Sequence, residues 1–408
     1  MLNNHNSMTL PLHTGHPPAY LIRRMTSLSK AICTIFIKEF GTIEFLKRIS
    51  DPLWFQAFGC VLGFDWHSSG VTTVVMGVLK QSLSANSHGI IIAGGKGKKS
   101  RQTLKEIETG SQNEFNLSDN KINSLLYASR MSAKIDNSAI QDSYSLYHHN
   151  ILFDQDGNWS VVQQGLYNKN NTARRYHWFS KALKNGFTAE PHSGIIGDQS
   201  YSCTLDMTSS DSIENQKTSI DLVKNSINYD SYVSSINQLF KKKDQCVLDA
   251  WFDCPSPMTL SSSRIVPNHN CQNTDYKPSI AIDTDNHYSM PRKVNWDIFK
   301  RIYEIQPSSY EELLDIRGVG ATTVRSLSLI GELIYGTKSS WKDPVKFCFA
   351  HGGKDGVPFY VDRKSYDSSI AFLDSAIESA SISRDEKLEA LKKLSIYNSR
   401  IYSLSREG

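Results

Sequence analysis

Apolar residues recur at helical spacing near the start of the chain. After Pro17 and Pro18 they fall three or four positions apart, which predicts a helix that ends at Gly41 and contains Leu21, Met25, Leu28, Ile32, Ile35 and Phe36. A second helix should run to Ile49. Asp51 and Pro52 then have the chemistry of an N-cap and a first helical residue. The helix that they begin, PLWFQAFGCVLGF, is apolar on nearly every side, so we expect it to be buried.

Strand periodicity replaces helical periodicity between Gln141 and Ser180. Apolar and polar residues alternate on both sides of Asp156-Gly157, a dipeptide typical of a two-residue hairpin turn. That turn would set four pairs: Leu152 with Val161, Ile151 with Val162, Asn150 with Gln163, and His149 with Gln164. Polar groups would then gather at the open end of the ribbon. Gly89–Ala93 predicts another short buried strand, and Ser118–Asn137 predicts a helix with small residues such as Ser129 on its packing face.

The pattern weakens from about Ser193 to Met290, where Ser, Asn and Asp dominate. We expect residues 201–290 to be a linker or insertion, partly disordered, with one or two helices. Helical spacing returns at Trp296–Tyr303 and Tyr310–Leu314, and Ser369–Leu404 predicts amphipathic helices that pack or form a homodimer. The predicted fold is therefore α+β. Helices surround a small, partly antiparallel sheet in residues 1–200, and a helical domain occupies residues 291–408.

Composition narrows the class of protein. The apolar runs in the 408 residues are too short to cross a bilayer, and the N-terminus lacks the pattern of a signal peptide, so we expect no membrane association and a cytoplasmic location. Seven scattered cysteines fit reduced thiols better than a disulfide framework. A net charge of +4 permits a nucleic-acid partner without requiring one, so a DNA-binding role must depend on local clusters.

Two stretches could bind the DNA backbone. The stretch Arg317–Arg325 is similar to a helix-hairpin-helix, in which two glycines join two apolar helices and expose N–H groups to a phosphate; the residues proposed to contact DNA are Arg317, Gly318, Val319, Gly320 and Thr322. An ordinary helical hairpin is the alternative. The second stretch is the glycine-rich loop with cations Lys96, Lys98, Lys99 and Arg101. This loop lacks the spacing of a Walker A motif, which excludes a nucleoside triphosphatase of the P-loop class. The alternative to phosphate binding is a mobile surface loop.

Several blocks resemble a prokaryotic family named domain of unknown function 763. The resemblance includes DPLWFQAFGCVLGFDWHSSGVTT, AGGKGKKSR, ASRMSAKIDNSAIQDSYSLYHH, FDQDGNWSVVQQG, ARRYHW and AEPHSG, and in the C-terminal part DPVKF, FAHGGKDG and VDRKSYD. These blocks cover most of residues 10–192 and 296–395. DNA cleavage has been proposed for members, so the resemblance implies a DNA nuclease.

The residue types required for metal-dependent phosphodiester hydrolysis are present in these blocks. Carboxylates would hold Mg²⁺ or Mn²⁺, imidazoles would carry protons, and arginines would bind phosphate. We assign Asp65, Asp142 and Glu190 as candidate metal ligands, with Pro191 holding Glu190 extended. The other candidates are His67, His177 and His192 for proton transfer, Arg174 and Arg175 for phosphate, and Gln163 and Gln164 to orient phosphate or water. We expect these groups to meet in one solvent-filled pocket.

Other interpretations of the same residues stay open. Asp65 could instead cap the next helix, with His67 as a satisfied polar contact. The loop with His351, Lys354, Asp355 and Arg363 could complete the site or hold two domains together. For the whole chain, the alternatives to a nuclease are a non-catalytic DNA-binding protein and a hydrolase or transferase that acts on a small phosphorylated substrate.

Overall fold

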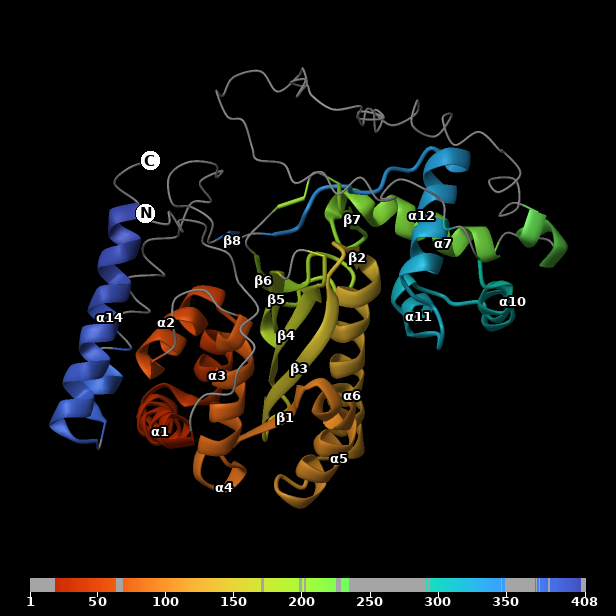
Figure 1. Ribbon diagram of the computed structural model, residues 1–408. Helices are drawn as coiled ribbons and strands as arrows, with labels where there is room; N and C mark the ends of the chain where they lie inside the picture. The colour runs from red at the N-terminus through yellow and green to blue at the C-terminus, as the bar shows by residue number, and fades with distance from the viewer. Residues whose placement is uncertain are drawn as a thin grey trace. The chain divides into compact units, whose positions relative to one another are not determined.

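The computed structural model describes residues 19–63, 69–169, 172–197, 200–201, 203–224, 229–234, 291, 294–345, 347–348, 371, 373, 375–380 and 382–404 (Figure 1). The chain divides into two compact units. Unit 1 contains Met1–Asp136, Ser143–Ser200 and Val345–Gly408, whereas unit 2 contains Asn137–Asp142 and Tyr201–Pro344. The predicted division into residues 1–200, 201–290 and 291–408 stays a prediction.

A six-stranded sheet forms the centre of unit 1, in the order β1-β3-β4-β5-β6-β8. Its strands are β1 (Ile90–Lys96), β3 (Ser145–Asp154), β4 (Trp159–Tyr167), β5 (Thr172–Phe179), β6 (His192–Gly197) and β8 (Phe347–Cys348). The first five pair in an antiparallel manner, and β8 pairs parallel to β6. Short 3₁₀ turns follow β1 (η1, Gly97–Gln102) and β5 (η3, Ser180–Ala182).

Helices cover both faces of this sheet (Figure 1). The helices on one face are α1 (Ala19–Ile49), α2 (Pro52–Leu62), α3 (Ser69–Ser82) and α4 (Ala85–His88), whereas α5 (Thr103–Asn113) and α6 (Asp119–Lys134) lie on the other. We call these the α3 face and the α6 face. The last helix, α14 (Arg384–Leu404), packs on α2. Because both faces are covered, polar side chains on either side of the strands are buried among helices.

The N-terminal helices follow the sequence pattern closely. Asp51 accepts hydrogen bonds from the N–H groups of Leu53 and Trp54, as expected of an N-cap before Pro52. Gly41 has a φ of 82°, so the two predicted helices join across a kink within α1. The predicted buried helix is α2, and ten of its eleven residues are buried. Its aromatic residues stack in the core, where the rings of Trp54 and Phe58 lie 5.2 Å apart.

The predicted hairpin exists as β3 and β4, but its predicted register is wrong by one residue. Ile151 pairs with Val161, and His149 pairs with Gln163. The reason lies at Asp154, whose Oδ1 accepts hydrogen bonds from the N–H groups of Asp156 and Asn158. This side chain stabilises a longer loop in which Gly157 alone takes positive φ, 84°, whereas a type I′ turn needs positive φ at two positions. A shift of one residue exchanges the partners across the whole ribbon.

Unit 2 is mainly helical. Its elements are β2 (Ile140–Gln141), β7 (Leu205–Asp206), η4 (Ser210–Ser212), α7 (Ile213–Lys224), α10 (Trp296–Ile305), α11 (Tyr310–Asp315) and α12 (Ala321–Tyr335). Strands β2 and β7 form a small antiparallel ladder. Ser309 caps α11 by accepting a hydrogen bond from Glu312 N–H. The mixed fold of helices and a largely antiparallel sheet, with a helical C-terminal region, confirms the predicted α+β class.

Candidate functional site

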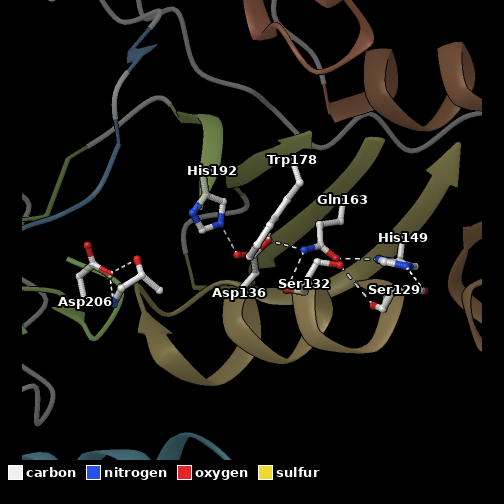
Figure 2. A network of polar contacts seen from close by, with 9 residues as sticks. Ser129, Ser132, Asp136, His149, Gln163, Trp178, His192 and Asp206 are labelled. Atoms are coloured by element: carbon white, nitrogen blue, oxygen red, sulfur yellow. Dashed lines mark hydrogen bonds and ion pairs between the residues drawn. The ribbon is translucent and has the colours of Figure 1, made fainter. Parts of the chain in front are cut away.

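A buried carboxylate on the α6 face of unit 1 is the centre of a polar network (Figure 2). Asp136 has no exposed surface and accepts hydrogen bonds from three side chains. His192 Nε2 donates to Oδ1 over 2.5 Å, while Trp178 Nε1 over 2.9 Å and Gln163 Nε2 donate to Oδ2. A carboxylate held by three N–H donors in a protein interior orients each donor tightly.

Two backbone irregularities bring the pair of Asp136 and His192 together. Helix α6 continues into a single π-helical turn, η2 (Ile135–Ala139), which carries Asp136. Such turns are frequent at functional sites. On the facing sheet, the β5–β6 ladder shifts register between His177 and Trp178, so His192 lies opposite Trp178. The rings of these two residues are 4.3 Å apart, and the side chain of His192 is 4% exposed.

The ring of His192 has one nitrogen engaged and one available. Nε2 donates to Asp136, which leaves the lone pair of the neutral imidazole on Nδ1. No hydrogen bond joins Nδ1 to any residue that the structure describes. An imidazole fixed by a carboxylate on one nitrogen and open at the other can act as a general base.

The network extends along the α6 face to two further residues. His149 Nδ1 lies 2.7 Å from Gln163 Oε1, and its Nε2 lies 2.8 Å from the hydroxyl of Ser129. Burial lowers the pKa of His149, so the ring is neutral at physiological pH. These residues form a row in space, which runs from Ser129 through His149, Gln163 and Asp136 to His192 (Figure 2).

A second polar network occupies the α3 face. Gln164 donates to the carbonyl of Ser69 over 3.0 Å and to the Tyr147 hydroxyl, and it accepts a hydrogen bond from Thr72. Arg175 also donates to Thr72 Oγ1, over 3.3 Å. Since its members link α3 to three strands, this network joins the helix to the sheet.

Arg175 also holds His177 in this second network. Arg175 Nε donates to His177 Nε2 over 2.8 Å, and His177 Nδ1 donates to the carbonyl of Ile49 over 3.0 Å. Burial, and then the charge of Arg175, keep the pKa of His177 well below its usual range. With both nitrogens bonded and no exposed surface, His177 has no free position for a substrate proton.

The sequence predicted one solvent-filled pocket for these residues, and the described geometry corrects that expectation. Consecutive residues of a strand point to opposite faces. Gln163 therefore joins the network of Asp136, whereas Gln164 joins the network of Arg175. Arg174 and Arg175 are 0% and 1% exposed, and their guanidinium groups lie over the rings of Tyr144 and Phe55 at 4.7 and 4.6 Å.

Of the predicted metal ligands, Asp65 lies outside the described residues, as do His67 and the loop with His351, Lys354, Asp355 and Arg363. Asp142 is buried in unit 2, whereas Glu190 is exposed in unit 1. Glu190 was expected to be extended, but its φ is 47°. Among the described residues, no group of three His, Cys, Asp or Glu side chains is arranged to hold a metal ion.

The basic loop in unit 1 is well exposed. Lys96, Lys98, Lys99 and Arg101 all lie on the surface around η1, and none of them forms an ion pair with another residue in the described part of the chain. The preceding strand approaches β3 very closely at Gly94, which has a φ of 101°. A Cβ added at Gly94 would lie 2.2 Å from the carbonyl oxygen of His149. The close approach explains why a glycine stands at the start of this loop.

A tight turn joins α11 and α12 in unit 2, which both a helix-hairpin-helix and an ordinary helical hairpin require. Gly318 has a φ of 100°, Val319 is 1% exposed, and Gly320 precedes α12 in extended conformation. The N-cap residue of α12, Gly320, has no side chain to cap the helix, while Arg317 and Thr322 beside it are exposed. Arg301 of α10 donates to the carbonyl of Arg317 over 2.6 Å, which stabilises the turn.

Sequence reasoning named Gln163 and His192 but missed Asp136, Ser129 and Ser132. A signal was present: positions 129, 132 and 136 follow helical spacing, so three polar residues lie on the side of α6 that packs against the sheet. The small size of the serines on such a face favoured a packing role. The hydrogen bonds of Ser129 Oγ and of the Ser132 carbonyl show instead that this face is a polar contact surface.

Comparison with known proteins agrees with the resemblance seen in the sequence blocks. The family described as protein of unknown function (DUF763) matches residues 6–361 of the chain. No curated protein and no solved structure matches the chain. Because the match spans most of the chain, including both networks and the hairpin, this protein belongs to the DUF763 family.

Proposed function

We propose that this protein binds DNA through backbone phosphates and hydrolyses a phosphodiester bond, with His192 as the group that accepts the proton from water. The observation that carries the hydrolytic part is the hydrogen bond between His192 Nε2 and the buried Asp136, which leaves Nδ1 available. The observation that supports DNA as the substrate is the hairpin that precedes α12.

The hairpin favours phosphate binding for an electrostatic reason. The first N–H groups of an α-helix have no partner within the helix and carry a partial positive charge. In α12 these groups belong to Ala321, Thr322 and Thr323, next to the exposed Arg317. A phosphate oxygen can accept from them without any contact to a base, so the binding would not depend on DNA sequence.

The basic loop of unit 1 supplies a second group of cations. Each lysine or arginine that neutralises a phosphate releases bound counterions, so the affinity for DNA should fall steeply with salt. Lys96, Lys98, Lys99 and Arg101 are suited to this because they are exposed and close together in sequence.

The chemistry at His192 follows from its hydrogen bonds. In the proposed step, water attacks phosphorus and gives its proton to Nδ1, so a new O–P bond forms while the ester P–O bond breaks. Asp136 stabilises the imidazolium, which then returns the proton to the leaving oxygen. General acid–base catalysis of this kind contributes roughly 10²- to 10⁴-fold in rate.

A divalent ion remains part of the prediction. Phosphodiester hydrolysis often uses Mg²⁺ or Mn²⁺ to polarise the phosphate and to stabilise the leaving oxygen. Asp142 and Glu190 belong to different units and Asp65 is outside the described residues, so we derive no step through a metal. Chelation tests the prediction directly.

The experiment uses purified protein with supercoiled plasmid and with single-stranded DNA, in Mg²⁺ or Mn²⁺, with and without a chelator. Binding is measured separately by gel retardation across a salt series. Gly320→Val tests the hairpin without straining the backbone, because Gly320 has negative φ and a Cβ added there would be 4.0 Å from its nearest atom. We expect this variant to bind DNA more weakly at unchanged thermal stability. Unchanged affinity would remove the hairpin from the binding site.

A non-catalytic DNA-binding protein is the second candidate, and one observation favours it. The two arginines predicted to bind phosphate are almost fully buried, with their guanidinium groups stacked on aromatic rings. Retardation that falls with salt, without any cleavage, would support this candidate. Turnover of a small phosphate ester in place of DNA would instead identify the third predicted class.

A further inference from the structure

Ser129 and His149 are buried polar residues that the proposed reaction does not use. Ser129 is 3% exposed on α6, and His149 is 7% exposed on β3. Their hydrogen bond of 2.8 Å joins a helix to the sheet. Only Gln163 separates them from Asp136, because its Oε1 faces His149 and its Nε2 faces the carboxylate (Figure 2).

The direction of every hydrogen bond in this row is determined by its neighbours. A carboxylate without a proton accepts only, so Gln163 must turn its NH₂ group toward Asp136. The same NH₂ group donates to the carbonyl of Ser132 over 3.0 Å. Gln163 Oε1 therefore accepts from His149, which places the imidazole hydrogen on Nδ1. The lone pair of His149 Nε2 then accepts the hydroxyl hydrogen of Ser129.

This row cannot conduct protons from one end to the other, because the amide of Gln163 interrupts it. An amide nitrogen does not release a proton under these conditions, so the row can hold an orientation but not transfer charge. The alternative tautomer of His149 would donate from Nε2 and accept at Nδ1. Gln163 would then have to reverse, and its oxygen would face the oxygen of Asp136.

We propose that Ser129 and His149 are positioning residues for the pair of Asp136 and His192. Ser129 donates to Nε2 and holds the ring of His149, His149 donates to Oε1 of Gln163 and holds that amide, and the amide supplies one of the two donors on Oδ2 of Asp136. Oδ1 is thereby left to His192. The catalytic consequence rests on the proposed function of His192, whereas the orientation of the row does not.

The test compares Ser129→Ala with Ser82→Ala in the full chain. Ser82 is a buried helical serine on the other face of the sheet, hydrogen-bonded to Ser29 over 3.0 Å. Two-dimensional ¹H–¹⁵N correlation spectra of the imidazole nitrogens report the tautomer of His149. We expect hydrogen on Nδ1 of His149 in all three proteins, because Asp136 fixes the amide of Gln163. The Nε2 resonance should move only in Ser129→Ala, where Nε2 loses its hydrogen-bond donor. DNA cleavage by Ser129→Ala should fall roughly tenfold in kcat with unchanged KM, since displaced catalytic groups slow reactions by such factors.

A second pair of variants keeps the test informative if Ser129→Ala folds poorly. His149→Asn retains an N–H near the place of Nδ1, whereas His149→Leu does not, so the first should keep more activity. Unchanged kcat in Ser129→Ala, or equal losses in the two His149 variants, would overturn the proposal. If the wild type cleaves no DNA, the proposed function fails, and the spectra alone decide whether Ser129 orients the row.

Discussion

Replacement of Asp136 by asparagine should separate the fold from the proposed chemistry. The substitution preserves shape but replaces one accepting oxygen with an NH₂ donor. Oδ2 accepts from both Gln163 and Trp178, so a donor there would oppose two N–H groups. The new NH₂ should therefore occupy the place of Oδ1 and donate to His192 Nε2. The hydrogen of His192 then moves to Nδ1, and the proposed base is lost.

The magnitudes follow from this rearrangement. A hydrogen bond to a charged group contributes about 1.5–3 kcal/mol, and the reversed bond replaces part of it, so we expect a loss of about 1–3 kcal/mol in unfolding free energy. Loss of the base should slow cleavage by roughly 10²- to 10⁴-fold. A stability change of this size cannot explain such a loss of rate if the protein remains folded.

Asp154→Asn is a matched control. Asp154 is also fully buried and accepts hydrogen bonds, but it lies at the end of β3, where it caps the β3–β4 loop, away from His192. Urea unfolding and plasmid cleavage are measured for both variants at the same pH. Both should lose stability, and only Asp136→Asn should lose cleavage per folded molecule. If folded Asp136→Asn cleaves within twofold of the wild type, the reasoning about His192 is wrong.

Three further predictions concern stability and binding. Gly94→Ala should destabilise unit 1 by about 3 kcal/mol or more, because the added Cβ would meet the backbone of β3. Gly97→Ala should cost only about 1 kcal/mol, since nothing lies within 4 Å of its added Cβ. Similar urea midpoints for the two variants would contradict the close approach of Gly94 to β3. Burial lowers the pKa of His148 from 6.5 to about 3, so between these pH values the unfolded chain binds a proton that the folded chain does not. The contribution of His148 to the unfolding free energy is therefore complete above pH 6.5 and falls by about 1.4 kcal/mol per pH unit toward pH 3. His148→Leu should flatten this slope, and an unchanged slope between about pH 7 and 4.5 would refute the role of His148. Lys98→Ala with Lys99→Ala should reduce the slope of log Kd against log salt by about 0.9 for each phosphate that the variant no longer neutralises, and an unchanged slope would place the loop outside the DNA site.

The helices and strands could be predicted because their apolar periodicities differ. The capped helix after Asp51 and the hairpin of β3 and β4 follow from these patterns. The register of that hairpin did not, because the Asp154 side chain determines the turn, and the preference of Asp156-Gly157 for a two-residue loop is weaker than those hydrogen bonds.

The expected absence of membrane-spanning segments concerns a separate feature. Among the helices that the structure describes, none has the length and apolar character of a membrane span.

The candidate site was predicted only in part. Gln163 was named because polar groups gather at the open end of the predicted ribbon, and His192 was named because an imidazole can carry a proton. Arg174 and Arg175, predicted as phosphate ligands, are buried, and the sequence did not reveal this because a strand pattern does not show that helices cover both faces of the sheet. Asp136 was missed because the small serines on the same side of the helix favoured a packing role, and because the sequence pattern does not reveal the π-helical turn that carries Asp136.

The most direct test of the account is cleavage by a His192→Ala protein that still binds DNA. Wild type and variant are compared under single-turnover conditions with labelled DNA, at equal fractions bound in gel retardation. We predict that the wild type cleaves and that the variant binds with the same Kd but cleaves at least about 100-fold more slowly. Equal cleavage rates at equal occupancy would contradict the assignment of His192 as the base.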